Sequence, residues 1–243
     1  VIFPPLFLFP HIYGFFRMKH DATEKLCHFG YSYVGKRANN EDNFEILQLN
    51  PNSYFMAVAD GMGGYEGGET ASQLTMEAAL EILGNITEKI TIQAGKNLLG
   101  EIFLTADKKI AAAKKQWPEL SSMGTTLTCL LVIGDQYIWG NIGDSRIYLI
   151  HKNHIHQITK DHTYLEHFGG KNKENLPKKV REQYGNTLTK ALDGSLQTPD
   201  IYPLNEDSMR LKPGQAFLLC SDGLITDTTE DKPNRLLETV HRE

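Results

Sequence analysis

Cysteine is scarce in this 243-residue chain, and its placement gives no sign of a disulfide framework. The three cysteines, Cys27, Cys129 and Cys220, have no C-x-x-C spacing, and the last two lie inside apolar runs where a thiol behaves as a small hydrophobe. An odd count without a secretory signal favours a reducing compartment. We therefore expect a cytoplasmic protein.

Positive charge is also in short supply. The chain has 25 Lys and Arg residues against 30 Asp and Glu residues, which gives a formal net charge of −5. This balance provides no general electrostatic reason to bind nucleic acid or an anionic membrane. The fingerprints G-x-G-x-x-G and G-x-x-x-x-G-K-[ST] are missing as well, which disfavours a dinucleotide-binding protein or a kinase. Any phosphate site must therefore be local.

No apolar run is long enough to predict a membrane span. Residues 1–16 are apolar, but the first ten include three prolines, no basic region precedes them, and a spanning helix needs ~20 apolar residues. We expect residues 1–17 to be an extension outside the fold, upstream of a start at Met18, with a weak interfacial anchor as the alternative. Residues 18–243, in a chain with 40% apolar residues, are expected to form one domain.

Periodicity predicts strands, then two helices, then strands again. Residues 29–49 and 54–60 read as a hairpin, and helical spacing recurs over 69–83 and 99–117. The next β-rich runs predict an antiparallel meander over 125–159, followed by a polar, mobile segment bordering a site over 160–186 and a strand over 211–223. This order predicts an α+β layered domain instead of a doubly wound parallel sheet.

Acidic residues stand at the ends of the strand-like runs. Asp60 follows the apolar run 54–59, Asp144 and Asp222 end two further runs, and Glu41 and Asp42 lie upstream. Singly, each is an ordinary turn residue. Together in one cleft they would repel, and without a cation some would take up protons. The pattern therefore predicts a metal, and oxygen ligands with no nearby His or Cys favour Mg²⁺ or Mn²⁺ over zinc.

Two further residues suit phosphate chemistry at such a site. Gly61 could offer its backbone carbonyl to an ion, since a residue without Cβ allows close approach. A pair of ions about 3.5–4 Å apart would bridge a water and clamp phosphoryl oxygens. Arg37, four residues before Glu41, could hold two phosphate oxygens with its fork of donors; the alternative is a surface arginine.

Seven motifs follow one another along the chain. They are Arg37-x-x-x-Glu41-Asp42, Asp60-Gly61-Met62-Gly63-Gly64 with Gly68-Glu69-x-Ala71-Ser72, Gly124-Thr125-Thr126, Asn141-x-Gly143-Asp144-Ser145-Arg146, Asp161-His162-Thr163, Asn186-x-Leu188-Thr189-Lys190-Ala191-Leu192 and Ser221-Asp222-Gly223-Leu224. Each motif is weak alone, but together and in this order they resemble those of a known family, the metal-dependent serine/threonine protein phosphatases of type 2C in their bacterial form. The resemblance runs from about Phe29 to Asp227.

The resemblance implies a four-layer α-β-β-α sandwich, two antiparallel sheets flanked by helices, with a binuclear Mn²⁺/Mg²⁺ centre at one end. It implies that Asp60 bridges both ions, that the Gly61 carbonyl binds one and that Asp222 binds the other. It also implies that Glu41 and Asp42 act through bound waters.

The remaining implied roles concern substrate and a third ion. Arg37 would hold the substrate phosphate, which makes Arg37, Asp60 and Asp222 the expected catalytic set. Asp144, together with Asp222, would match a third metal site.

Segment 160–186 corresponds to the family's flap. Arg146 and Ser145 are expected to be structural, holding the loop after Asp144 by hydrogen bonds, and His162 is either a structural or a catalytic histidine.

The sequence departs from the family pattern in places. The family's closing Asp-Asn-x-Thr segment is not found before Glu243, so we expect a C-terminally incomplete domain that lacks one metal ligand. Tyr65 and Met62 stand where relatives have a histidine. Thr226 replaces a carboxylate, with Asp227 one position late.

The predicted function is hydrolysis of phosphoserine and phosphothreonine in proteins by a metal-bridging water, in signal transduction that could involve a serine/threonine kinase and its targets. The alternative is a catalytically impaired domain that binds phosphoproteins or regulates a partner. The missing last aspartate favours the alternative, whereas the retained acidic set favours the enzyme. Oligomeric state is left open by the sequence.

Overall fold

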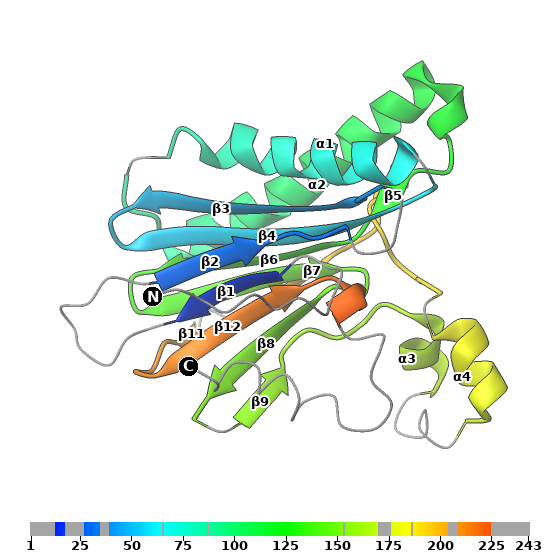
Figure 1. Ribbon diagram of the computed structural model, residues 1–243. Helices are drawn as coiled ribbons and strands as arrows, with labels where there is room; N and C mark the ends of the chain where they lie inside the picture. The colour runs from blue at the N-terminus through cyan, green and yellow to red at the C-terminus, as the bar shows by residue number, and fades with distance from the viewer. Residues whose placement is uncertain are drawn as a thin grey trace.

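Two antiparallel sheets lie face to face, and two long helices cover the outer face of one of them (Figure 1). The structure is a computed structural model that describes residues 13–17, 27–34, 39–64, 66–86, 88–152, 154–169, 176–185, 187–203 and 209–224. The larger sheet runs in the order β10 (Asp200–Tyr202), β7 (Gln136–Ile142), β6 (Leu127–Ile133), β4 (Ser53–Met62) and β3 (Asp42–Asn50), with β11 (Met209–Arg210) beside β7 and β5 (Gly124–Thr125) beside β4.

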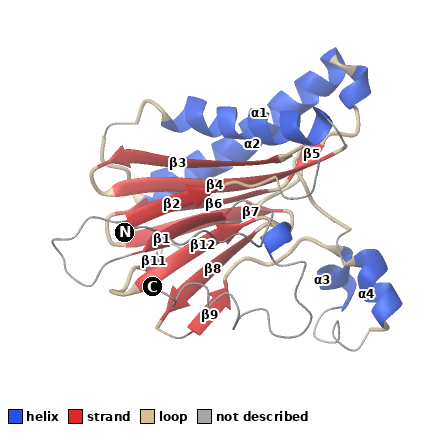
Figure 2. Ribbon diagram, viewed as in Figure 1, coloured by secondary structure: helices blue, strands red, loops and turns tan. Residues whose placement is uncertain are grey.

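The smaller sheet and the helices complete the fold (Figure 2). The smaller sheet runs in the order β2 (Cys27–Tyr31), β1 (Tyr13–Arg17), β12 (Gln215–Cys220), β8 (Arg146–His151) and β9 (His154–Gln157). The helices are α1 (Glu66–Leu83), α2 (Ile92–Gln116), α3 (Tyr164–Gly169) and α4 (Lys178–Tyr184), with short 3-10 turns η1 (Pro118–Leu120) and η3 (Asp222–Leu224). None of the helices in these described ranges is long and apolar enough to cross a membrane.

Strand β4 is buried on both faces, which explains its continuous apolar sequence. Successive side chains point to opposite faces of a strand. Accordingly Phe55 and Ala57 join the core beneath α1 and α2, whereas Met56 and Val58 join the core between the sheets. The strand that ends in Asp60 is therefore fixed from both sides.

The α+β sandwich of two antiparallel sheets expected from the sequence is confirmed. The 69–83 and 99–117 periodicities lie in α1 and α2, and the hairpin around residues 51–52 joins β3 to β4. Over the described residues, helices cover only the larger sheet, so a helical layer over the smaller sheet stays a prediction. The polar 160–186 segment holds α3 and α4, which lie at one end of the sandwich (Figure 1).

The meander expected over 125–159 is wrong in its middle. Strands β6 and β7 pair in the larger sheet, but β8 and β9 belong to the smaller one. The chain changes sheet at Gly143-Asp144-Ser145. A local pattern of strands and turns cannot distinguish a hairpin from such a crossing, because both need the same turn residues. The crossing carries Asp144 to the end where both sheets meet.

The expectation that residues 1–17 lie outside the fold is wrong for residues 13–17. These form β1, which pairs antiparallel with β12 on one side and β2 on the other, with Tyr13 opposite both Cys220 and Tyr31. Aromatic residues favour strands, and without β1 the edge of β12 would have unpaired main-chain groups. Similarly, residues 27–31 form β2 in the smaller sheet instead of extending β3.

Candidate functional site

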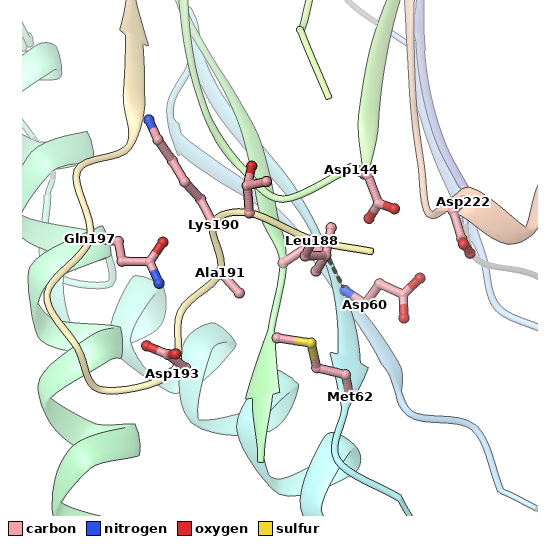
Figure 3. A pocket seen from close by; sticks show the side chains of 11 residues that line it. Asp60, Met62, Asp144, Leu188, Lys190, Ala191, Asp193, Gln197 and Asp222 are labelled. Carbon is pink, nitrogen blue, oxygen red and sulfur yellow. Dashed lines mark hydrogen bonds between the residues drawn. The ribbon is translucent and has the colours of Figure 1, made fainter. Parts of the chain in front are cut away.

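A cleft of about 380 Å³ opens at one end of the sandwich (Figure 3). Strands β4 and β12 end there, and the turn between β7 and β8 lies beside them. The carboxylates of Asp60, Asp144 and Asp222 lie together on one side of it. The cleft is lined by Asp60, Met62, Thr126, Asp144, Leu188, Thr189, Lys190, Ala191, Asp193, Gln197 and Asp222.

The backbone of Asp60 is locked by two threonines. Its N–H donates to Thr126 Oγ1 at 2.9 Å. Its carbonyl oxygen accepts from the N–H of Thr126 at 2.9 Å and from Thr125 Oγ1 at 2.9 Å. With its main chain fixed at both polar groups, Asp60 can direct its partly exposed carboxylate into the cleft.

Asp42 reaches the same carboxylate from the neighbouring strand. It stands directly opposite Asp60 in the β3–β4 pair, and side chains directly opposite one another in a sheet are close enough to interact. Its side chain is buried, with an exposed fraction of 9%, and Oδ2 accepts a 2.8 Å hydrogen bond from Ser221 Oγ. That bond ties β3 to the residue just before Asp222.

Close packing and hydrogen bonds hold the turn that carries Asp144. Gly143 has φ +99°, and a Cβ on it would lie 2.5 Å from Thr126 Cγ2, so this turn requires glycine. The Gly143 N–H donates to His162 Nδ1 at 3.0 Å, and its carbonyl accepts from the His162 N–H at 2.9 Å. Ser145 Oγ lies 2.7 Å from Thr126 Oγ1.

His162 makes hydrogen bonds of the kind expected for a structural role. With Nδ1 accepting a hydrogen bond, the proton of the neutral ring belongs on Nε2, which lies 3.3 Å from Asp200 Oδ2. Burial lowers the pKa of His162, which favours that neutral form. The structural roles expected for Ser145 and Arg146 are also confirmed, since the Arg146 guanidinium contacts both carboxylate oxygens of Asp161.

The clustered carboxylates perturb one another. Burial, followed by Asp42 and Asp222, raises the pKa of Asp60 well above its usual value. Burial, Asp222 and Asp161 raise the pKa of Asp144 to about 7. Both shifts have the sign expected for like charges brought together with partial loss of water.

The donor set fits a hard divalent cation. A cation would relieve the repulsion that raises these pKa values, and the ligands offered are oxygens. Across the part of the chain that the structure describes, no three His, Cys, Asp or Glu side chains are close enough together to hold a metal ion by themselves. Ions such as Mg²⁺ keep several waters and need few carboxylates, so oxygen donors of this kind suit them better than structural zinc.

The other predicted site residues have different surroundings. The Glu41 carbonyl accepts from the Gly61 N–H at 3.1 Å and from Ser72 Oγ at 2.6 Å, which anchors the segment before β3 to β4 and α1. A Cβ on Gly61 would overlap the Gly68 carbonyl, so this glycine is required by helix–strand contact. Arg37 lies outside the described residues, as do Tyr65, Thr226 and Asp227.

Thr126 belongs to the Gly124-Thr125-Thr126 motif, and the sequence alone predicts no role for it. In the structure one hydroxyl joins the Asp60 main chain to Ser145, so it links the two sheets where the acidic residues converge. The signal in the sequence was the Gly124-Thr125-Thr126 motif. The bond partners lie 66 and 19 residues away, which no local pattern reveals.

The comparison with protein families agrees with this geometry. Residues 29–242 match the model of the family described as protein phosphatase 2C. The chain belongs to the protein phosphatase 2C family. Among curated members, it is 33% identical over 199 residues to the serine/threonine protein phosphatase PstP of Mycobacterium tuberculosis, covering 80% of this chain and 35% of PstP. It is 27% identical over 208 residues to the serine/threonine phosphatase stp of Listeria monocytogenes, covering 84% and 79%.

Solved structures of protein phosphatase 2C relatives share the fold. The M. tuberculosis PstP/Ppp structure superposes with a TM-score of 0.67 at 26% identity, covering 95% of this chain and 86% of that one. The catalytic domain of PstP in complex with two manganese ions gives a TM-score of 0.65 at 26% identity, covering 96% and 89%. This chain spans about a third of the full length of the curated PstP proteins.

Replacing Thr126 by valine should loosen the site of this protein phosphatase 2C member. The Asp60 N–H and Ser145 Oγ would both lose a buried partner, which costs about 1–3 kcal/mol of unfolding free energy. Thr128→Val is the matched control, because the Thr128 hydroxyl is buried without a hydrogen-bond partner among the described residues. Chemical denaturation should show a loss for Thr126→Val and none for Thr128→Val; equal losses would contradict the role of Thr126.

Asp144 should make the metal-free protein less stable as pH rises. Its folded-state pKa of about 7 lies above the reference value of 3.8, so its proton is held more tightly in the folded state. The resulting stabilisation is present below the reference value and is lost as pH rises through about 7. In EDTA, Asp144→Asn should therefore raise the melting temperature more at pH 8.5 than at pH 5.5. An equal change at both pH values would contradict the assignment.

Proposed function

We propose that this chain hydrolyses phosphoserine and phosphothreonine in proteins at a binuclear Mn²⁺/Mg²⁺ centre. The observation that carries the proposal is the convergence of Asp60, Asp144 and Asp222 on one cleft in a member of the protein phosphatase 2C family. The manganese ions in the PstP catalytic domain support the same metal chemistry. Natural substrates would then be phosphoproteins made by serine/threonine kinases, with a role in signalling in the cytoplasm.

The residues that would hold the ions divide by position. Asp60 would contact both ions, the Gly61 carbonyl and Asp222 one each, and Glu41 and Asp42 would act through waters. Asp144 with Asp222 would provide a third, weaker site. When bound, two such ions would neutralise the clustered carboxylates and lower the pKa of a water molecule that serves as the nucleophile in an in-line displacement.

The chain's own part in the reaction is to position these groups. Thr125 and Thr126 hold the Asp60 main chain, which fixes the strand end from which its carboxylate projects. Ser221 holds Asp42. Such preorganisation matters because hydrolysis of phosphate monoesters is among the slowest uncatalysed reactions, and fixed charges that need no rearrangement contribute most of the acceleration.

The test is Mn²⁺-dependent release of phosphate from a phosphothreonine peptide by the purified chain. We expect release with Mn²⁺ or Mg²⁺, none with EDTA, and little with Zn²⁺. A folded chain that binds the phosphopeptide tightly but releases no phosphate with any of these ions would support the alternative, a phosphatase-like domain that binds phosphoproteins. The retained acidic set favours the enzyme.

Arg37 keeps its proposed role in holding the substrate phosphate. An arginine fork gives two parallel hydrogen bonds to a phosphate, and their loss weakens binding of the substrate. Arg37→Ala should therefore raise KM for the phosphopeptide by about tenfold or more, whereas Arg37→Lys should restore only part of that loss. Steady-state kinetics would check this, and an unchanged KM in Arg37→Ala would count against the assignment.

A further inference from the structure

Part of the cleft wall opposite the carboxylates comes from a short loop, residues 193–197 (Figure 3). Asp193 and Gln197 line the cleft, and Leu196 stands between them in the chain with an exposed fraction of 61%. Most of this large apolar side chain is therefore open to solvent, between two residues that line the cleft. We call this segment the 193–197 loop.

A buried carboxylate of helix α2 holds the 193–197 loop in place. Asp107 has an exposed fraction of only 2%. Its Oδ1 accepts the N–H groups of Asp193 at 3.0 Å and Gly194 at 2.8 Å, and its Oδ2 accepts the N–H of Leu196 at 2.7 Å. Burying a carboxylate is costly unless hydrogen bonds compensate it. Here three compensating hydrogen bonds come from one surface loop.

Helix α2 adds two more contacts to the same loop. Lys114, on the same helix as Asp107, donates from Nζ to the Asp193 carbonyl at 2.7 Å. Gly194 has φ +87°, and a Cβ on it would lie 2.9 Å from Ala111 Cα, so the loop packs directly against the helix. The loop is therefore held rigidly instead of lying free on the surface.

The backbone of the loop is strained at its exposed residue. Leu196 has φ +58°, in the left-handed region, which is unfavourable for a residue other than glycine. Such conformations persist only where the surroundings impose them, and they cluster at functional sites. Here the three hydrogen bonds that Asp107 accepts from Asp193, Gly194 and Leu196 impose the conformation of the loop.

We infer that the 193–197 loop recognises the polypeptide around the phosphorylated residue, and that substrates with Lys or Arg next to that residue are preferred. This inference rests on the proposed phosphatase function. Leu196 would contact the substrate chain, and the Asp193 carboxylate would attract the cationic side chain. Asp107 is a positioning residue that acts through the loop.

The lysines near Asp193 leave its carboxylate able to attract a cationic side chain of the substrate. Lys190 points away from it in Figure 3, donating to the Thr198 carbonyl at 3.1 Å and lying 3.6 Å from Asp200 Oδ1. Lys114 contacts the main-chain oxygen of Asp193. The Asp193 Oδ1 accepts the Ser195 N–H at 3.0 Å, and the residue is only half-buried, so its carboxylate stays accessible to a substrate.

The experiment compares three phosphate esters with Mn²⁺ present: 4-nitrophenyl phosphate and two phosphothreonine peptides that differ only in a flanking Arg or Glu. Wild-type protein should prefer the Arg peptide. Asp193→Asn keeps the acceptor for Ser195 but removes the charge, and should reduce the Arg-over-Glu preference about threefold. Leu196→Gly, which relieves the strain, should lower the ratio of peptide to 4-nitrophenyl phosphate kcat/KM about fivefold.

Two further variants separate recognition from general damage. Asp107→Asn replaces one of the two acceptor oxygens by an NH2 group, which cannot accept the hydrogen bond of the Leu196 N–H. This variant should raise KM for both peptides more than it changes kcat. Leu104→Ala, at an exposed position of α2, is the control and should change neither ratio. If Asp193→Asn and Leu196→Gly change all three esters equally, the recognition role is overturned.

Failure of the phosphatase function would be seen separately. In that case wild-type protein would release no phosphate from any ester, including 4-nitrophenyl phosphate. Fluorescence anisotropy of the same labelled peptides would then decide the inference, since the loop should still favour the Arg peptide in binding, and Asp193→Asn should remove that preference. Equal binding of both peptides by the wild type would overturn it.

Discussion

Asp60→Asn is expected to lower Mn²⁺-dependent phosphate release by about a thousandfold or more. The substitution keeps the size of the side chain but removes the charge around which Asp42, Asp144 and Asp222 converge. In the proposed centre Asp60 would contact both ions, so its loss would remove several kcal/mol of transition-state stabilisation, and each 1.4 kcal/mol is about tenfold in rate. Steady-state release of phosphate from a phosphothreonine peptide measures this directly.

The same variant should fold at least as well as the wild type without metal. Its contacts with Thr125 and Thr126 are made by the main chain and survive the substitution. The wild-type carboxyl has its pKa raised by burial and by neighbouring carboxylates, so a neutral amide relieves that repulsion. In EDTA, the melting temperature of Asp60→Asn should match or exceed that of the wild type, while the rise caused by added Mn²⁺ should be lost.

A matched control is available at the far end of strand β7. Asp135 lies in the β6–β7 turn, is largely exposed and pairs with Arg210 on the surface. Asp135→Asn makes the same chemical change and should leave phosphate release unaltered. Near-normal release by Asp60→Asn would refute the proposed metal chemistry. A loss shared by Asp135→Asn would show that the assay reports protein quality instead of the site.

The acidic residues could be predicted because each follows an apolar run in the sequence. A strand buried on both faces must end at the surface, and an Asp-Gly or Gly-Asp step at that point is visible without any structure. Asp60, Asp144 and Asp222 were found in this way, and they do share one cleft. The sheet to which each strand belongs was not visible, so the crossing at Asp144 was mistaken for part of a meander.

The supporting groups could not be predicted, because their partners are distant in sequence. Asp107 looks like one polar residue on a helix, yet it accepts hydrogen bonds from a loop more than 80 residues later. Strand β1 shows the same limit. Its short apolar sequence is ambiguous by itself, and only the open edges of β2 and β12 decide that it belongs to the sheet.

The sequence predicts that Gly61 binds a metal ion through its carbonyl, and the structure shows a second reason why this position requires glycine. A Cβ at this position would overlap the carbonyl group of Gly68 on α1 and lie 2.5 Å from the Glu41 carbonyl oxygen. These are main-chain atoms, so no change of rotamer can relieve the overlap. The strand, the helix and the segment before β3 must separate instead, and the Gly61 N–H bond to Glu41 lengthens as they do.

Gly61→Ala should therefore destabilise the protein by about 3 kcal/mol or more, which corresponds to a fall in melting temperature of roughly 6–12 °C for a chain of this size. Gly100→Ala is the control, because the nearest atom to its added Cβ lies 3.8 Å away and alanine favours a helix interior by about 1 kcal/mol. That variant should melt at the wild-type temperature or above. A Gly61→Ala protein that melts like the wild type would contradict the close contact between β4 and α1.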